Sequence, residues 1–173
     1  MKKRRNTLRV YLSGGMEYAS NEGADWRYDL EAWIKKNLRH SVFNPNHESE
    51  KYLSKKHPGA NLRALKTENV EAFTRIVRGI VDLDSREVAY RSDYIICLWD
   101  RSAAKGAGTK GELTLAKFFG KPVYMVTKMK QENIAGWVLG CTTKMFASFD
   151  ELKSFLLNEY GALSTKHTKE ARR

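Results

Sequence analysis

A carboxylate near a glycine-rich helix start is the feature of this sequence best suited to chemistry. Glu112 lies in the segment Gly108-Thr109-Lys110-Gly111-Glu112-Leu113, which follows an apolar stretch at 94–99. A helix beginning there places Glu112 at the carboxyl end of a buried strand, where open α/β sheets bind ligands. Because helix N–H groups favour an anion, we expect an ionised carboxylate. Such a group can attack an electrophilic sugar carbon as a nucleophile.

The same spacing also fits a simple helix cap. Thr109 and Glu112 are separated as in a capping box, in which the glutamate only closes the first helical turn. A side chain engaged in a cap is not free to face a ligand. The sequence leaves both roles open, and the hydrogen-bond partners of Glu112 distinguish them.

Further polar residues are expected at the same edge of the sheet. Ser13-Gly14-Gly15 follows the first predicted strand, and glycines there let backbone N–H groups approach a phosphate or sugar. A purely structural turn is the alternative. Asp100 ends a predicted strand, and Asp82 and Asp84 precede the helix that leads into that strand. Each of these acids could equally be a solvated loop residue.

Apolar periodicity predicts the elements that position these residues. Strands are expected at 8–12, 41–45, 93–99, 120–126 and 144–146, and helices at 24–38, 67–79, 83–91, 110–119 and from Ser148 onward. This alternation implies a parallel sheet with helices on both faces. About five short strands indicate a flavodoxin-like, doubly wound α/β fold, in which the first, third and fourth strands end at one crevice.

Two polar segments, 46–66 and 127–143, are predicted to be irregular. The first carries Lys55, Lys56 and other basic residues, so a mobile lid that attracts phosphate and a solvated insertion both stay open. The second contains Trp137, which either contacts a neighbouring subunit or packs within its own chain.

Length and composition indicate one domain, assigned to 8–160 between basic tails at 1–7 and 161–173. No apolar run approaches the roughly 18 residues that a membrane span needs. The two cysteines, Cys97 and Cys141, suggest no disulfide framework, so a reducing, cytoplasmic setting is expected.

Charge and histidine spacing narrow the choice of ligand. Much of the net charge of +11 lies in the tails, so nucleic-acid binding is weakly indicated, while a modestly positive body suits a small phosphate-bearing ligand. His47 and His57 match no metal-ligand spacing, and we expect neither a metal nor a cofactor.

Four segments, taken in order, resemble the nucleoside 2-deoxyribosyltransferase family and its nucleotide N-glycosidase relatives. They are 10–14 with Trp26-Arg27 downstream, Asp84 with 93–96, 108–113, and Ala116 with 120–123. The resemblance implies a flavodoxin-like fold and cleavage or transfer at the N-glycosidic bond of a nucleoside or nucleotide. It further implies that Glu112 attacks the anomeric carbon to form a glycosyl-enzyme intermediate, from which a second base or water takes the sugar.

The resemblance also assigns the remaining site. Asp84, or Asp82 in its place, matches an acidic residue that helps hold sugar or base, and Asp100 is a candidate substitute for an aspartate that the family often has at position 106, here glycine. The implied substrate-binding residues are Tyr11, Ser13, Gly14, Gly15, Gly108 and Thr109. The family usually completes its pocket with a neighbouring subunit, so a homo-oligomer is expected.

Two other functions stay open on the same sequence. A non-catalytic nucleotide-binding or sensor module could use the same fold, because fold does not fix function. A nucleic-acid-associated protein acting through its basic tails is the third reading.

Overall fold

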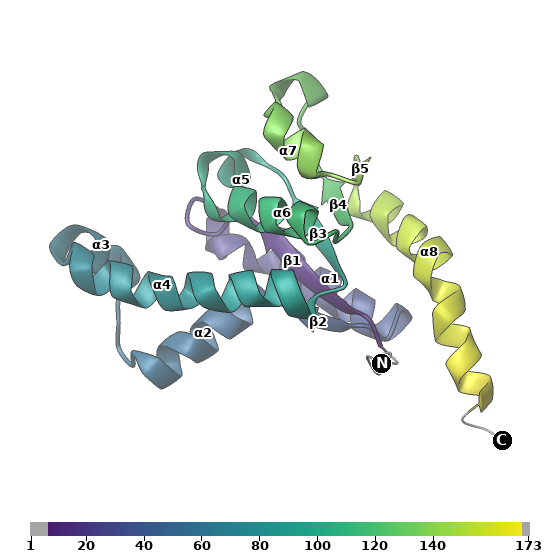
Figure 1. Cartoon of the computed structure of the whole chain (residues 1–173), viewed down its shortest axis with the longest axis horizontal. Helices are drawn as coiled ribbons and strands as arrows, with labels where there is room; N and C mark the ends of the chain where they lie inside the picture. The colour runs from purple at the N-terminus through teal and green to yellow at the C-terminus, as the bar shows by residue number, and fades with distance from the viewer. Residues whose placement is uncertain (1–6, 171–173) are drawn as a thin grey trace.

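A five-stranded parallel sheet forms the centre of the protein, as the computed structural model of residues 7–170 shows (Figure 1). The strands are β1 (Arg9–Gly14), β2 (Ser41–Phe43), β3 (Tyr94–Leu98), β4 (Val123–Val126) and β5 (Lys144–Phe146). Their order is β2-β1-β3-β4-β5, with every neighbouring pair parallel. The predicted flavodoxin-like, doubly wound fold is therefore confirmed.

Helices cover both faces of this sheet (Figure 1). They are α1 (Ala24–Asn37), α2 (Pro45–Lys56), α3 (Leu62–Glu68), α4 (Val70–Arg86), α5 (Arg101–Lys105), α6 (Gly108–Phe118), α7 (Gly136–Cys141) and α8 (Phe149–Glu170). Buried side chains of α1 and α8 pack on one face, including Leu30 and Leu152. The other face is covered by α6 through Leu113 and by the π-helical turn Glu87–Arg91 that continues α4.

The alternation of side chains along β1 determines what each face receives. Val10 and Leu12 belong to the core beneath α1 and α8, whereas Tyr11 belongs to the core beneath α6. Because successive residues of a strand point to opposite faces, Ser13 lies on the same face as Tyr11. Two hydroxyl groups near the carboxyl end of β1 are thus directed toward α6.

The prediction of an irregular segment at 46–66 is wrong, because α2 and α3 occupy most of it. Side chains of Asn44 and Asn61 cap the two helices, accepting hydrogen bonds from the N–H groups of Asn46 and Ala64, both at 3.1 Å. Pro45 occupies the start of α2, a position that proline favours. These helices bury little apolar surface, so their composition resembles that of a loop.

Other boundaries also differ from the predicted ones. The helices expected at 67–79 and 83–91 form one continuous helix, α4, with its π-helical extension. The short helix α5 was not predicted, and 127–143 contains α7 and a 3₁₀ turn, Gln131–Asn133. Helix α8 continues to Glu170, past the point where a tail was expected. Residues 1–6 of the N-terminal tail lie outside the described part of the chain.

Side chains of Ser148 and Glu151 cap the start of α8, at the residue where the sequence predicts this helix to begin. The Glu151 N–H donates to the Ser148 hydroxyl at 3.2 Å, and the Glu151 carboxylate accepts from the Ala147 N–H at 2.9 Å. Within residues 7–170, no helix combines the length and the apolar character needed to cross a membrane.

Gly15, which directly follows β1, provides a test of how closely the chain approaches α5 there. A Cβ atom at this position would lie 2.7 Å from the Ala103 nitrogen and 2.8 Å from the Ser102 carbonyl carbon, both in the backbone of α5. We expect Gly15→Ala to lower the free energy of unfolding by about 1–3 kcal/mol, because this backbone cannot yield without moving α5. Urea unfolding measures the change.

Gly108→Ala is the matched control, because no atom lies within 4 Å of a Cβ built there. It should leave stability unchanged or raise it by up to about 1 kcal/mol. Equal effects of the two substitutions would contradict the close packing of Gly15 on α5.

Candidate active site

Glu112 points toward β1 and not back at the start of its own helix. Its Oε1 accepts a hydrogen bond from the Tyr11 hydroxyl at 2.8 Å, and its Oε2 accepts one from the Ser13 hydroxyl at 2.5 Å. Helix α6 begins at Gly108, and no side chain caps its start at Ala107. The capping-box alternative is therefore excluded, and Glu112 is held by residues distant in the sequence.

Asp84 is the second carboxyl group of the site. It lies near the end of α4, and burial, followed by the negative charge of Glu112, raises the pKa of its carboxyl to about 8. The charge of Arg27 and the nearby Tyr11 hydroxyl act in the opposite direction. Its buried Oδ1 has no hydrogen-bond partner among the described residues. Asp82 is exposed on the same helix, so Asp84 is the residue that faces Glu112.

Burial also raises the pKa of Glu112, against the effects of the Ser13 and Tyr11 hydroxyls and of the Arg27 charge. The groups that favour the ionised form of Glu112 are therefore the Ser13 and Tyr11 hydroxyls and Arg27, and not the start of α6 as expected from the sequence. The field of a helix terminus fades beyond the first turn, and Glu112 lies just beyond it. Hydroxyl groups and a buried guanidinium take over the role that the sequence assigned to α6.

That guanidinium belongs to Arg27, a residue the sequence analysis did not place in the site. Arg27 is fully buried where α1 packs against β1. Its position was detectable, because Arg27 falls on the buried stripe of α1 together with Leu30 and Ile34. A charged residue on the apolar stripe of an amphipathic helix is rarely there without a partner.

The other predicted residues lie around this group without contacting Glu112 through a described hydrogen bond. Asp100 caps α5, its Oδ1 accepting from the Ala103 N–H at 2.9 Å and from the Ser102 hydroxyl. The Gly14 carbonyl accepts from Arg27. At the start of α6, Thr109 is buried and Gly108 is exposed.

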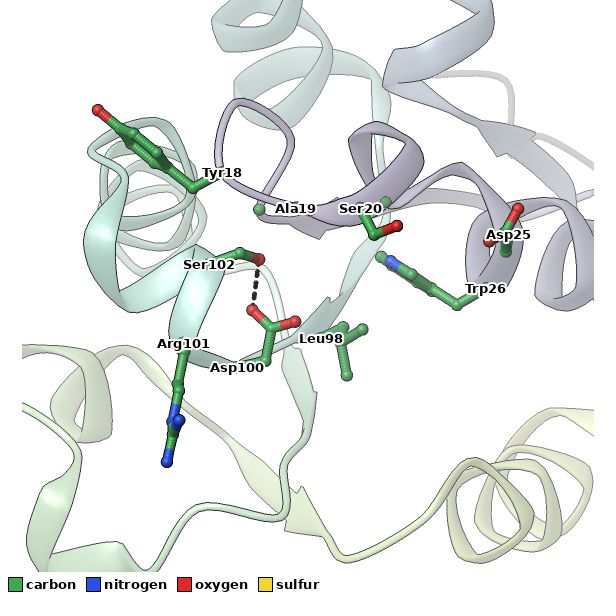
Figure 2. A pocket seen from close by; sticks show the side chains of 11 residues that line it. Tyr18, Ala19, Ser20, Asp25, Trp26, Leu98, Asp100, Arg101 and Ser102 are labelled. Carbon is green, nitrogen blue, oxygen red and sulfur yellow. Dashed lines mark hydrogen bonds between the residues drawn. The ribbon is translucent and has the colours of Figure 1, made fainter.

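A pocket of about 540 Å³ opens at the carboxyl ends of β1 and β3. Figure 2 shows the Asp100 carboxylate, which accepts a hydrogen bond from the Ser102 hydroxyl, on one side of this pocket. Trp26 lies across the pocket from Asp100, and Tyr18 lies at its rim. A larger hollow of about 880 Å³ adjoins it over β4 and the start of α8, and the two share Leu98, Asp100 and Arg101.

Glu112 and Asp84 line neither hollow. Trp26 and Leu98 pack with the core beneath α1 and α8, whereas Tyr11 packs with the core beneath α6. The first pocket nevertheless includes Gly15, two residues beyond the Ser13 whose hydroxyl binds Glu112. Taken as a whole residue, Glu112 is half-buried, and its two carboxylate oxygens are held by the buried Tyr11 and Ser13 hydroxyls. The described residues contain no group of three His, Cys, Asp or Glu side chains suited to a metal ion.

Comparison with known proteins adds support at the level of the fold. No protein-family model and no curated protein matches the chain. A solved 2-desoxiribosyltransferase from Leishmania mexicana is similar over 87% of this chain and 97% of its own, with a TM-score of 0.53 and 16% identity. A CMP N-glycosidase from Clostridium botulinum aligns over 86% and 97%, with a TM-score of 0.47 and 16% identity. At this identity, the first similarity shows a shared fold.

The buried carboxyl of Asp84 predicts a specific dependence of stability on pH. Its folded-state pKa of about 8 lies above the unfolded value of roughly 3.9, so the folded state holds a proton that the unfolded state releases. This contribution is complete below about pH 4 and is lost as pH rises toward 8. Asp84→Asn removes the titrating group. Relative to the wild type, the variant should therefore gain roughly 2–4 kcal/mol between about pH 4.5 and 8.5.

Chemical unfolding at a series of pH values measures this gain. Asp82→Asn is the control, because Asp82 is an exposed aspartate on the same helix, and its profile should run parallel to the wild type. A parallel profile for Asp84→Asn as well would show that Asp84 is ionised in the folded protein at neutral pH.

Proposed function

We propose that the protein cleaves or transfers at the N-glycosidic bond of a nucleoside or nucleotide, with Glu112 as the nucleophile. The observation that carries this proposal is the placement of Glu112 between the Tyr11 and Ser13 hydroxyls, beside the carboxyl group of Asp84. Paired carboxyl groups in different environments are what a retaining glycosidic mechanism needs. The fold shared with a 2-desoxiribosyltransferase is consistent with this chemistry.

In the first step, a Glu112 oxygen attacks the anomeric carbon. A carbon–oxygen bond forms, the carbon–nitrogen bond to the base breaks, and the bonding electrons leave with the base nitrogen. Because the pKa of Asp84 is about 8, this group holds a proton at neutral pH and can transfer it to the departing base. The product of this step is a sugar ester of Glu112.

In the second step, water or a second base attacks the anomeric carbon and releases Glu112 as a carboxylate. Asp84, now ionised, accepts the proton of the attacking group and returns to its starting state. The Tyr11 and Ser13 hydroxyls hold Glu112 in a fixed orientation throughout, so that the attacking oxygen needs little rearrangement.

The rest of the substrate can occupy the pocket beside Gly15, close to the end of β1 that carries Ser13. The rings of Tyr18 and Trp26 in that pocket are suited to stacking against a base. Gly14, Gly108 and Thr109 are assigned as substrate-binding residues near the sugar, and Asp100 as an acceptor for polar groups of the base.

An exposed aromatic residue on α7 bears on whether the protein assembles into an oligomer. Trp137 is 69% exposed on α7, which supports a homo-oligomer in which this face meets a neighbouring subunit.

A nucleotide sensor on the same fold is the alternative function. It would bind the ligand in the same pocket without breaking the glycosidic bond.

Glu112→Gln tests the nucleophile. The substitution keeps the size and polarity of the side chain but removes the attacking charge, and we expect base release to fall by at least about a thousandfold. Chromatography of the base freed from a panel of nucleosides and nucleotides measures turnover. Calorimetry should show that the variant still binds the substrate.

Glu132→Gln is the matched control, because the Glu132 side chain is 74% exposed far along the chain from the site, and it should keep wild-type turnover. Retention of near-wild-type turnover by Glu112→Gln would refute the proposed nucleophile. A wild-type protein that binds one member of the panel tightly and cleaves none would favour the sensor.

A further inference from the structure

Arg27 is a buried cation whose hydrogen bonds all go to uncharged oxygen atoms. Its Nε donates to the Leu12 carbonyl at 3.1 Å, and its Nη2 donates to the Gly14 carbonyl at 2.8 Å. Its Nη1 donates to the carbonyls of Glu22 and Gly23 and to Asn46 Oδ1, at 3.0–3.3 Å. Arg27 is the only buried lysine or arginine in the described part of the chain. Burying a charge without an opposite charge bound to it costs several kcal/mol of folding free energy. A buried arginine of this kind therefore indicates a specific structural or functional role.

The first two hydrogen bonds hold the strand on both sides of Ser13. Leu12 and Gly14 flank Ser13, and their carbonyl groups both accept from the same planar guanidinium. The two donors, Nε and Nη2, form a rigid planar fork that fixes both the distance and the direction of the two carbonyl groups. The backbone at Ser13 therefore cannot rotate freely. The Ser13 hydroxyl on the opposite face of the strand is thereby directed at Glu112.

The remaining hydrogen bonds hold a strained turn. Asn21, Glu22 and Gly23 have φ values of 47°, 51° and 66°, three successive residues in the left-handed region. Non-glycine residues there cost roughly 1–2 kcal/mol each. Two hydrogen bonds from Arg27 Nη1 and one from Asn46 Nδ2 stabilise the turn through the carbonyl groups of Glu22 and Gly23. Such strain persists when the surrounding structure requires it, often near a functional site.

The charged and titratable groups that face Glu112 come from four elements. They are Tyr11 from β1, Arg27 from α1, Asp84 from α4 and Cys97 from β3. Arg27 is the single cation in this set of described residues. It lowers the pKa of Glu112, which burial raises.

We propose that Arg27 is a positioning residue for Glu112. Its guanidinium fork fixes the end of β1 from which the Ser13 and Tyr11 hydroxyls reach the carboxylate, and its charge favours the ionised form of Glu112. The functional importance of this role rests on the proposed nucleophile, but the effect on Glu112 exists whether or not the protein cleaves a nucleoside.

The titration of Glu112 itself provides the test. Protein labelled with ¹³C at the glutamate carboxyl carbons is followed by NMR across a range of pH, and the Glu112 signal is assigned by its loss in Glu112→Gln. We expect Arg27→Met to raise the midpoint of this titration by about one pH unit or more, a tenfold change in acidity. Arg27→Lys keeps a charge but loses the fork, and should raise the midpoint by roughly half a unit.

Arg9→Met is the matched control. Arg9 lies on the same strand and pairs with buried Glu87, so its loss destabilises the fold without removing a charge that faces Glu112. It should leave the Glu112 midpoint unchanged. An unchanged midpoint in Arg27→Met, or an equal shift in Arg9→Met, overturns the proposal. If Arg27→Met does not fold, an unchanged midpoint in Arg27→Lys overturns it.

The titration of Glu112 and the assay of nucleoside cleavage can fail independently of each other. A shifted midpoint in a protein that cleaves none of the nucleosides and nucleotides supports the role of Arg27 and refutes the proposed reaction. Normal cleavage through Glu112 with an unshifted midpoint supports the reaction and refutes the role of Arg27.

Discussion

The protein places two carboxyl groups against the end of a central strand and balances them with one buried guanidinium. Charges removed from water are costly unless other groups take over the solvation. For Glu112, the Tyr11 and Ser13 hydroxyls do so, while the positive charge of Arg27 acts from the other side of β1. Helices α1, α4 and α6 each supply one of these charged groups, Arg27, Asp84 and Glu112.

The consequence is a difference between two groups of the same chemical type. Glu112 accepts two hydrogen bonds that favour its ionised form, whereas a buried oxygen of Asp84 has no partner among the described residues. One carboxyl group is therefore suited to attack and the other to holding a proton, which is the division of roles in acid–base-assisted glycosidic chemistry. Both are fixed by regular elements, so the geometry does not depend on a flexible loop.

The sequence was most informative where the signal is local. Apolar strands such as 94–98 predicted the doubly wound sheet, which the structure confirms, and the glycine-rich start of α6 pointed to Glu112, whose catalytic role stays a prediction. The sequence could not choose between a cap and a ligand site for Glu112, because the spacing is the same and only contacts with β1 decide. The choice of Asp84 over Asp82 depended on the helical phase of α4, which was predicted as two separate helices.

The features that the sequence did not predict depend on polar residues that are buried in the folded protein. Helix α2 was predicted as a loop because its buried residues include Asn46 and Ser49, which give no apolar periodicity. The sequence does not predict the role of Arg27, because nothing local reveals that its partners are carbonyl groups of β1 and of a left-handed turn. Such contacts join segments far apart in the sequence.

The central claim is that Glu112 forms a covalent bond to the sugar, and trapping that intermediate tests it most directly. A nucleotide fluorinated at the sugar carbon next to the anomeric carbon slows the second step, so the ester should accumulate. We predict that mass spectrometry of the digested protein finds the added mass of the sugar on the peptide that contains Glu112, and finds none in Glu112→Gln. Release of the base with inversion at the anomeric carbon, and with no modified peptide, would contradict the account.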